Sequence, residues 1–382
     1  MLGVAVAWQV YSITHRAIDL GYVGLVQFVP AFGLSLPAGS VADRFDRARI
    51  LALSNVAQAL CACALLLLAR TAPTSVASIY IVLLFVGVAR AFEAPAGQAL
   101  VPGLVPRDEF PGAVSWTSTV WQLSTIVGPS LGGLLYGPTD GAARAYAAGA
   151  WSLAAASALA FTIRARTVPG ERPEGAWSSV LGGIRFVRRQ PVILEAISLD
   201  LFAVLLGGAT ALLPIYASDV LHVGPQGLGL LRSAPALGAA AMAIALGRRP
   251  LEKRAGPVLL ASVAIFGAAT VVFGVSRSFG LSLGALLVVG ASDMVSVVVR
   301  STVVQLRTPH EMRGRVSAVN MMCILASSNL GELESGATAA WLGPVTAVVA
   351  GGLGTLAVVA VYALRRGGLR SVDRLDPLRA GP

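Results

Sequence analysis

Charged side chains are scarce in this sequence. Asp, Glu, Lys and Arg make up 13% of its 382 residues, whereas soluble globular domains contain about 25%. Hydrophobic residues make up 55% of the chain, and its mean hydropathy is +0.75. This composition excludes a soluble fold and predicts an all-α protein that crosses a lipid bilayer many times.

Cysteines and nucleotide-binding motifs are also rare or absent. The three cysteines, Cys61, Cys63 and Cys323, lie in apolar segments without a CxxC pair or a nearby histidine. They predict packing rather than a disulfide framework or a metal site. No G-x-x-x-x-G-K-[ST] stretch is present, which excludes ATP as the direct energy source. We therefore expect neither a cofactor nor a metal.

The sequence also lacks the features of a cleavable signal peptide, of an enzyme and of a nucleic-acid-binding protein. Met1 leads straight into an apolar stretch with no basic region before it, so no cleavable signal peptide is expected. The Asp-rich loop at residues 43–49 has no histidine beside it, so we expect no enzymatic activity and no catalytic residue. The net charge is +10, but the basic residues are neither clustered on one amphipathic segment nor interleaved with aromatics, which excludes nucleic acid as a partner.

Long apolar segments recur along the whole chain. Most are long enough to cross about 30 Å of hydrocarbon as a helix. The first is too short, so we expect a truncated first helix, as would follow from a start codon assigned too late. The twelve segments are 2–14, 20–42, 50–69, 76–98, 113–136, 142–163, 193–217, 226–247, 257–276, 279–303, 316–342 and 344–364.

The loops between these segments differ in positive charge. Alternate loops, together with the C-terminal tail, hold 22 Lys and Arg residues, and the opposite loops hold 4. Cytoplasmic loops of membrane proteins carry the excess of Lys and Arg. We therefore expect a multi-pass protein of the cell inner (plasma) membrane with both termini in the cytoplasm.

The longest loop divides the chain into two halves. We expect an N-terminal bundle of six helices (1–163), a cytoplasmic loop with a helix on the membrane surface (164–191), a C-terminal bundle of six helices (192–364) and a cytoplasmic tail (365–382). Residues 99–115 and 302–317 share a Pro, acidic residues and a closing Val-Ser. Such repeats are common in transporters, whose substrate lies between the halves at mid-membrane.

The loop after the second segment carries a recognisable pattern. It resembles motif A of the major facilitator superfamily, G-x-x-x-D-R-x-G-R-[RK], although Asp46 replaces a glycine and Ala48 a basic residue of that motif. The matching residues are Gly39, Asp43, Arg44, Arg47 and Arg49. The resemblance implies twelve helices in two bundles with pseudo-twofold symmetry, and a charged latch that must break when the bundles move. A carboxylate here can pair with arginines and with a helix N-terminus.

Two further stretches resemble motifs of the same family. Gly128, Pro129, Gly132 and Gly133 are similar to its antiporter motif, and small residues four apart let helices approach closely. Arg90 matches the arginine of the motif on the fourth helix, although Ala94 replaces a glycine there. WQVY (8–11) and GELESG (331–336) are most similar to exporters related to the enterobactin exporter. Antiport is implied by this resemblance alone.

Ionisable residues inside the apolar segments are candidates for substrate or proton handling. Each costs about 2.5–3.5 kcal/mol at a helix centre, so a partner or a function is expected. Arg90 and Glu93 are three residues apart and can pair on one helix face. Asp293 and Arg300 share a face, whereas Glu332 and Glu334 point away from each other and cannot both line one cavity. Asp200 is a further candidate, and a paired charge near a membrane edge is the alternative for each.

The sequence thus predicts a secondary transporter that works by alternating access. We expect a monomer in the lipid bilayer that exports a small amphipathic compound of the drug or siderophore type, driven by protons. The alternative is a protein of the same fold that no longer transports, because the first helix is short.

Overall fold

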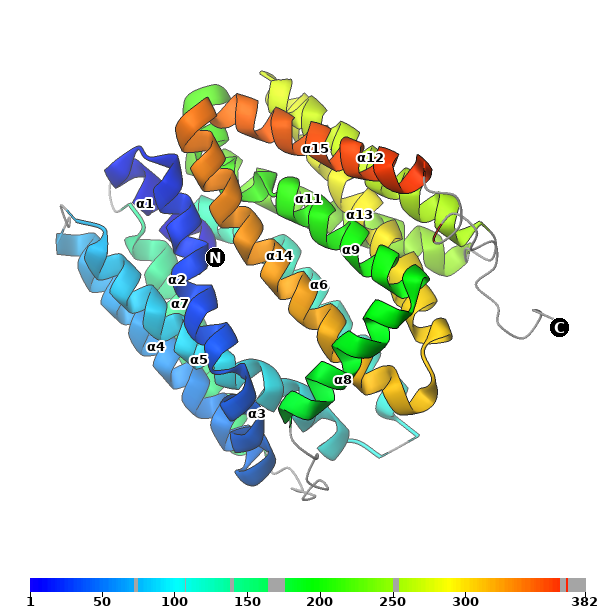
Figure 1. Cartoon of the computed structure of the whole chain (residues 1–382). Helices are drawn as coiled ribbons and strands as arrows, with labels where there is room; N and C mark the ends of the chain where they lie inside the picture. The colour runs from blue at the N-terminus through cyan, green and yellow to red at the C-terminus, as the bar shows by residue number, and fades with distance from the viewer. Residues whose placement is uncertain are drawn as a thin grey trace, which may run out of the picture. The chain divides into compact units, whose positions relative to one another are not determined.

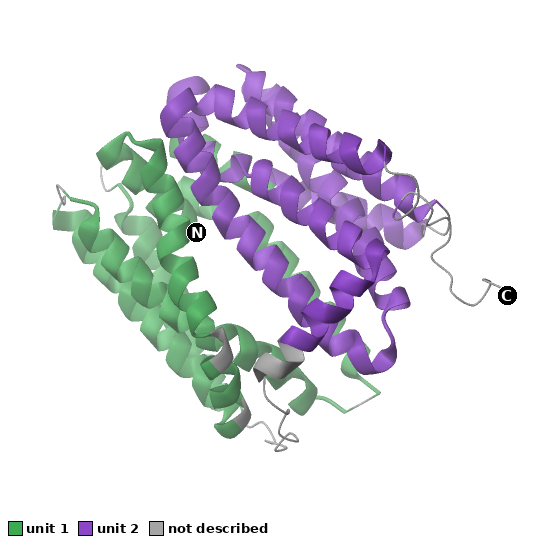
Figure 2. Ribbon diagram, in the orientation of Figure 1, with its two compact units in different colours: residues 1–172, 222–233 green, residues 173–221, 234–382 purple. Residues whose placement is uncertain are grey.

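The computed structural model describes residues 1–71, 75–106, 108–137, 141–163, 176–249, 254–364 and Leu369. Across these residues the regular structure is helical, apart from one isolated bridge between Gly137 and Gly141 (Figure 1). This confirms the all-helical prediction. The chain divides into two compact units, one of residues 1–172 and 222–233, the other of residues 173–221 and 234–382 (Figure 2). Helix α11 (Gly224–Arg248) begins in the first unit and ends in the second.

The first unit is built mainly from the helices before residue 163. They are α1 (Leu2–Thr14), α2 (Ala17–Gly33), α3 (Ser35–Arg44), α4 (Arg47–Thr71), α5 (Ala77–Leu100), the short η1 (Val101–Gly103), α6 (Phe110–Leu135) and α7 (Ala143–Thr162). Helix α4 packs between α5 and α7, and α5 also packs against α2. Apolar side chains of α1, α4, α5 and α7 form the core, among them Val6, Leu65 and Ile79.

A buried polar link crosses this core. The Tyr146 hydroxyl of α7 donates a hydrogen bond of 2.6 Å to Gln9 Oε1 of α1. Both side chains are buried, so each satisfies a polar group that would otherwise be left without a partner away from water. Gln9 belongs to the WQVY stretch that the sequence singled out.

The second predicted segment is two helices instead of one. Helices α2 and α3 meet at Leu34, where the helix is interrupted for one residue. Pro37 lies three residues later and lacks a backbone N–H, so it cannot donate to the carbonyl of Gly33, which is the usual way in which proline interrupts a long helix. The interruption therefore has a local cause that the hydropathy pattern does not record.

The second unit contains the remaining helices. They are α8 (Ala176–Arg189), α9 (Pro191–Leu206), η2 (Ala209–Leu212), α10 (Leu213–Ile215), the π-helical η3 (Tyr216–Val220), the end of α11, α12 (Ala255–Val275), α13 (Phe279–Arg307), η4 (His310–Met312), α14 (Arg313–Leu342) and α15 (Pro344–Leu364). Helix α12 packs against α13 and α15, and α9 against α13, α14 and α15. Leu199, Leu259 and Val299 lie in the core that these helices share.

Helix α8 lies in the loop where a helix on the membrane surface is predicted. Val187 is buried against Ile193 of α9 and Val316 of α14, whereas Leu181 and Ile184 are exposed. The helix therefore packs on the second unit by part of its apolar surface and leaves the other part uncovered.

Eight of the described helical segments are long and apolar enough to cross a membrane. These are Arg47–Thr71, Ala77–Gly103, Ala143–Thr162, Pro191–Val220, Gly224–Arg248, Ala255–Val275, Phe279–Arg307 and Pro344–Leu364. Helices α1 and α2 are apolar but shorter. Helices α6 and α14 are long but do not reach the same hydropathy, because they carry more polar residues, and together these account for the twelve predicted segments.

Candidate functional site

The charged corner between α3 and α4 is held by Asp46. Its Oδ1 accepts a hydrogen bond of 2.9 Å from the backbone N–H of Ala48, in the first turn of α4. Its Oδ2 lies 3.6 Å from Nε of Arg49, in a pair that is largely exposed. A side-chain oxygen before a helix satisfies one of its free N–H groups. The residue that departs from the family motif therefore caps the helix that follows.

Arg47 joins the ends of two helices. Its Nη1 donates a hydrogen bond of 2.9 Å to the carbonyl of Ala99 near the end of α5. Its Nε donates one of 3.4 Å to the carbonyl of Ala42 near the end of α3. The last carbonyls of a helix carry partial negative charge and favour a cation. One guanidinium thus ties α3, α4 and α5 together at this end of the first unit.

The other three motif residues of this corner are described by their exposure and surroundings instead of by polar contacts. Arg44 is exposed, and Gly39 is half-buried with open space where a Cβ would lie. Asp43 belongs to α3, but its side chain lies outside the described part of the chain. Among the predicted latch residues, Arg47 and Arg49 therefore have defined partners in the described part of the chain, and their role as a latch stays a prediction.

The two ionisable residues of α5 bind different partners. Arg90 Nη1 donates to Gln27 Oε1 of α2 at 3.0 Å, and Glu93 Oε2 accepts from Gln58 Nε2 of α4 at 2.7 Å. No ion pair joins Arg90 to Glu93 among the described residues. Instead, each charge is solvated by an amide from a neighbouring helix, so α2, α4 and α5 are connected by polar contacts.

The glycine-rich stretch of α6 packs tightly within the first unit. A Cβ on Gly133 would collide with the Pro225 carbonyl and lie 3.0 Å from Gly229 Cα, both in α11. The Ser233 hydroxyl of α11 donates to the Ile126 carbonyl at 2.6 Å and lies 2.8 Å from Ser130 Oγ. Close approach of two backbones requires a residue without a side chain.

The remaining residues of this stretch differ in their surroundings. A Cβ on Gly132 would lie 2.6 Å from the carbonyl oxygen of Met1, whereas one on Gly128 would make an ordinary contact of 3.5 Å. Pro129 lies inside the helix. Of the three glycines, Gly133 is therefore the one that packs against α11, and Gly128 is the most tolerant of a side chain.

A buried ion pair links α9 and α13 in the second unit. Arg300 Nη1 donates to Asp200 Oδ2, and both side chains are almost fully buried. A buried charge is tolerated only with a partner that offsets the loss of water. Because the two residues are 100 positions apart in the sequence, the pair brings together two candidates that the sequence could not connect.

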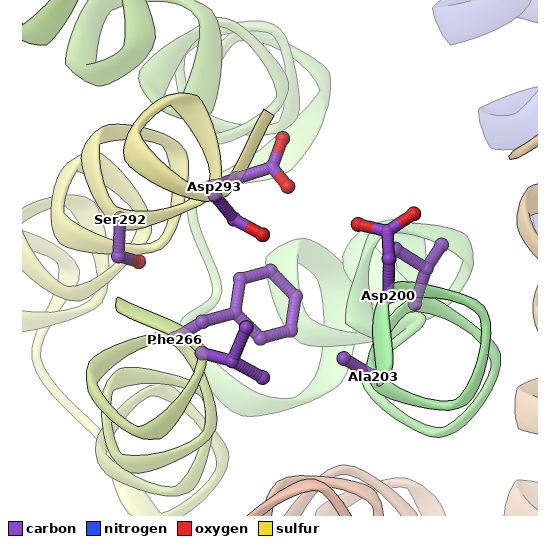
Figure 3. A pocket seen from close by; sticks show the side chains of 8 residues that line it. Asp200, Ala203, Phe266, Ser292 and Asp293 are labelled. Atoms are coloured by element: carbon purple, nitrogen blue, oxygen red, sulfur yellow. The ribbon is translucent and has the colours of Figure 1, made fainter. Parts of the chain in front are cut away.

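A small cavity lies beside this pair. It is lined by Asp200 and Ala203 of α9, Phe266 of α12 and Ser292 and Asp293 of α13 (Figure 3), with Val204, Val263 and Ser296 completing the lining. Its volume of about 10 Å³ is roughly what one water molecule needs. Asp293 and Asp200 reach toward this space from facing helices, with Phe266 beside them (Figure 3). Three of the predicted residues, Asp200, Asp293 and Arg300, thus form one cluster.

The two glutamates of α14 lie apart from that lining. Both are half-buried, and Glu334 Oε1 accepts a hydrogen bond of 2.8 Å from Thr338, one turn later in the same helix. The Gly331 backbone packs against the carbonyls of Val204 and Leu205, with a Cβ position only 3.0 Å from each. Gly331, next to Glu332, therefore allows α14 to pack closely against the end of α9.

Sequence reasoning missed the uncharged members of these sites. Gln27 and Gln58 hold the charges of α5, and Ser296 lines the cavity between Asp293 and Arg300 along α13. A signal for Ser296 was present, since 293, 296 and 300 share one face of a helix. Phe266 carried no signal, because α12 is apolar on all sides.

Helices long and apolar enough to cross a membrane, with buried, paired charges and closely packed glycines, indicate a multi-pass membrane protein. The sequence pattern of the Major Facilitator Superfamily matches residues 1–332. The chain therefore belongs to the major facilitator superfamily, whose members are transporters and not enzymes, and its predicted fold is confirmed.

Individual relatives are similar over nearly the whole chain. The enterobactin exporter EntS of Citrobacter koseri is 27% identical over 388 residues, covering 100% of this chain and 91% of its own. EntS of Shigella boydii serotype 18 is 27% identical over 363 residues, covering 94% and 86%.

Two solved structures share the fold. The nucleoside transporter NupG has a TM-score of 0.69 at 14% identity, with 95% of this chain and 94% of that chain covered. A bacterial homologue of the human lysosomal transporter Spinster, in an inward-facing and occupied conformation, has a TM-score of 0.68 at 13% identity, with 95% of each chain covered.

Proposed function

We propose that this transporter is a proton-coupled exporter of a small amphipathic compound of the siderophore or drug type. It works as an antiporter in the inner membrane by alternating access, as a monomer. The observation that carries the proposal is the similarity to enterobactin exporters, which extends from one end of the chain to the other. A likeness confined to one motif would support only the fold.

The charges inside the helices support proton coupling. Arg90, Glu93, Asp200, Asp293 and Arg300 lie in helices long enough to span the membrane, where an ionisable side chain is costly and is kept for a purpose. The neutral form of a carboxyl group is easier to accommodate in low dielectric than its charged form. Protonation therefore stabilises conformations in which such a group is buried. In this way a proton gradient can drive the conformational change of the transporter.

The conformational change is assigned to two places. The first is the corner of Gly39, Asp43, Arg44, Arg47 and Arg49, where Arg47 already binds two helix ends. The second is the stretch of α6 from Gly128 to Gly133, whose contact with α11 involves little side-chain material. In this proposal the predicted bundles 1–163 and 192–364 move as bodies. The contact between α6 and α11 joins the two bundles and changes between the states, whereas the corner, which lies within 1–163, engages the other bundle in one state and releases it in the other.

Inside-out membrane vesicles test this proposal directly. Vesicles from cells that produce the chain are energised so that their interior is acidic, and enterobactin or the amphipathic dye ethidium is added outside. We expect accumulation inside the vesicles, because exchange for protons drives the export direction. Filtration followed by chromatography measures the enterobactin, and fluorescence measures the dye.

Vesicles without the chain provide the baseline. Dissipating the pH gradient with nigericin should abolish accumulation above this baseline. Accumulation that survives nigericin would exclude proton coupling but keep export. If neither compound accumulates in vesicles that contain the folded chain, export of this substrate class is wrong, and the transport-inactive alternative takes its place.

A further inference from the structure

Asp293 differs from every other charged residue of its cluster. In the described part of the chain it forms no hydrogen bond and no ion pair, although it lines the cavity beside Asp200. Asp200 is paired with Arg300. The one cation of the cluster is thus already held by one of its two carboxylates.

Two polar atoms at the same place also lack partners. Ser296 Oγ and Arg300 Nε are buried without a hydrogen bond, and both residues are 3% exposed. Ser296 lines the cavity. Buried polar atoms are nearly always satisfied by protein or by an ordered water. A cavity with room for about one water and an unsatisfied hydroxyl at its wall is the kind of place where such a water binds.

The charge balance of the cluster sets the state of Asp293. Among the helices packed against α13, α9 carries Asp200 and Glu195, α12 carries no ionisable group, and α11, whose Pro235 backbone meets Gly290, carries Arg232 and Arg248. Of these groups, Asp200 lines the cavity. On α14 the thiol of Cys323 interacts electrostatically with Asp200 and Arg300. With Asp200 and Arg300 paired, the cluster is neutral when Asp293 carries a proton and has a net negative charge when it does not. An uncompensated buried charge is unfavourable.

We propose that Asp293 is the group that binds and releases the coupling proton, through a water molecule held by Ser296. The proposal rests on the proton coupling proposed above and names its site. In the release step the O–H bond of the neutral carboxyl breaks and the proton passes to the water, leaving a carboxylate. Nothing is oxidised or reduced. The Nε–H of Arg300, which has no other partner, then donates to the ionised carboxylate of Asp293. Arg300 thereby binds both Asp200 and Asp293.

Infrared difference spectroscopy detects this proton without any substrate. The purified chain in detergent is titrated with acid and base, and the C=O stretching band of a buried, protonated carboxyl group is followed. We expect this band in the wild type, its loss in Asp293→Asn, and its return at a different frequency in Asp293→Glu. Glu195→Gln removes a half-buried carboxylate from α9 that accepts a bond from the Leu369 N–H, and should leave the band unchanged.

Ser296→Ala tests the part assigned to the water. This variant keeps Asp293, so the band should remain. Exchange of the Asp293 proton for deuterium in heavy water should slow several-fold, because the water that accepts the proton is no longer held by Ser296. Exchange at the wild-type rate would overturn the water-mediated step. A band that persists in Asp293→Asn would overturn the whole assignment. The return of the band in Asp293→Glu would show that its loss in Asp293→Asn is not caused by misfolding.

The same variants separate this proposal from the proposed function. If the band belongs to Asp293 but the vesicles accumulate neither compound, the proton site stands and export is wrong. If Asp293→Asn vesicles still accumulate compound in a nigericin-sensitive manner, export stands and Asp293 is not the coupling group.

Discussion

The described ion pairs of this transporter include an exposed one and a buried one, and burial decides what each contributes. The Asp46–Arg49 pair is largely open to solvent, where an ion pair contributes little because water screens it. The Asp200–Arg300 pair is almost completely buried, so neither partner can regain water if the other is removed. The two pairs contain the same chemical groups, and the surroundings alone make them different.

Removing Arg300 is therefore expected to be costly. Arg300→Gln leaves Asp200 charged and buried without a partner, which should lower the free energy of unfolding by about 3–5 kcal/mol. The double variant Asp200→Asn, Arg300→Gln should recover part of this loss because no charge is left uncompensated. Thermal unfolding of the purified protein in detergent measures both effects.

Arg49→Gln is the matched control for that measurement. Its pair is exposed, so its effect should be at most about 1 kcal/mol. Equal destabilisation by Arg300→Gln and Arg49→Gln would show that burial of the Asp200–Arg300 pair does not matter for stability.

At the scale of helices, close packing depends on where glycine occurs and on how each helix begins. Helix α4 begins with the cap supplied by Asp46, and the corner is closed by Arg47 across two helix ends. Helix α6 contacts α11 through the backbone at Gly133. Helix α6 is also among the less apolar long helices, so its position depends more on such contacts than on hydropathy.

Gly133→Ala should therefore disturb α6 more than the same change elsewhere in the helix. The new methyl group meets the backbone of Pro225 and Gly229, which cannot rotate away, and overpacking of this kind costs about 1–3 kcal/mol. Gly112→Ala in the same helix has open space around it and should be neutral or slightly stabilising, because alanine favours the helix. Thermal unfolding of the two variants compares them, and an equal response would contradict the close contact.

At the scale of the whole molecule, positive charge predicts which side of the membrane each loop faces. The loops and tail predicted to be cytoplasmic hold 22 Lys and Arg residues, against 4 on the other side. Such a difference is known to orient helical membrane proteins. The fold itself is the same in either orientation, so the orientation needs its own experiment.

Reporter fusions test the predicted orientation. Alkaline phosphatase folds only outside the cytoplasm, so a fusion after Ser276, in the α12–α13 loop, should be active in a bacterial host. A fusion after Gln190 should be inactive, whereas green fluorescent protein at that same position should fluoresce. The reverse pattern would contradict a cytoplasmic location of the central loop and of the chain ends.

The sequence by itself determined the membrane class, the twelve helical segments and the family. These properties depend on sums over neighbouring residues, such as the hydropathy of about 20 positions, or on a short motif such as residues 39–49. It also placed Asp293 and Arg300 on one helix face, because that relation depends only on their spacing.

Only the tertiary structure decided which partners the charged groups take. Arg300 pairs with Asp200 instead of Asp293, Arg90 and Glu93 bind amides of other helices, and Arg47 binds Ala99, 52 positions away. Such contacts depend on which helices pack together and how each is rotated about its axis. Spacing within one helix cannot supply that information, and for the same reason Phe266 and Ser296 emerged as cavity residues only in three dimensions.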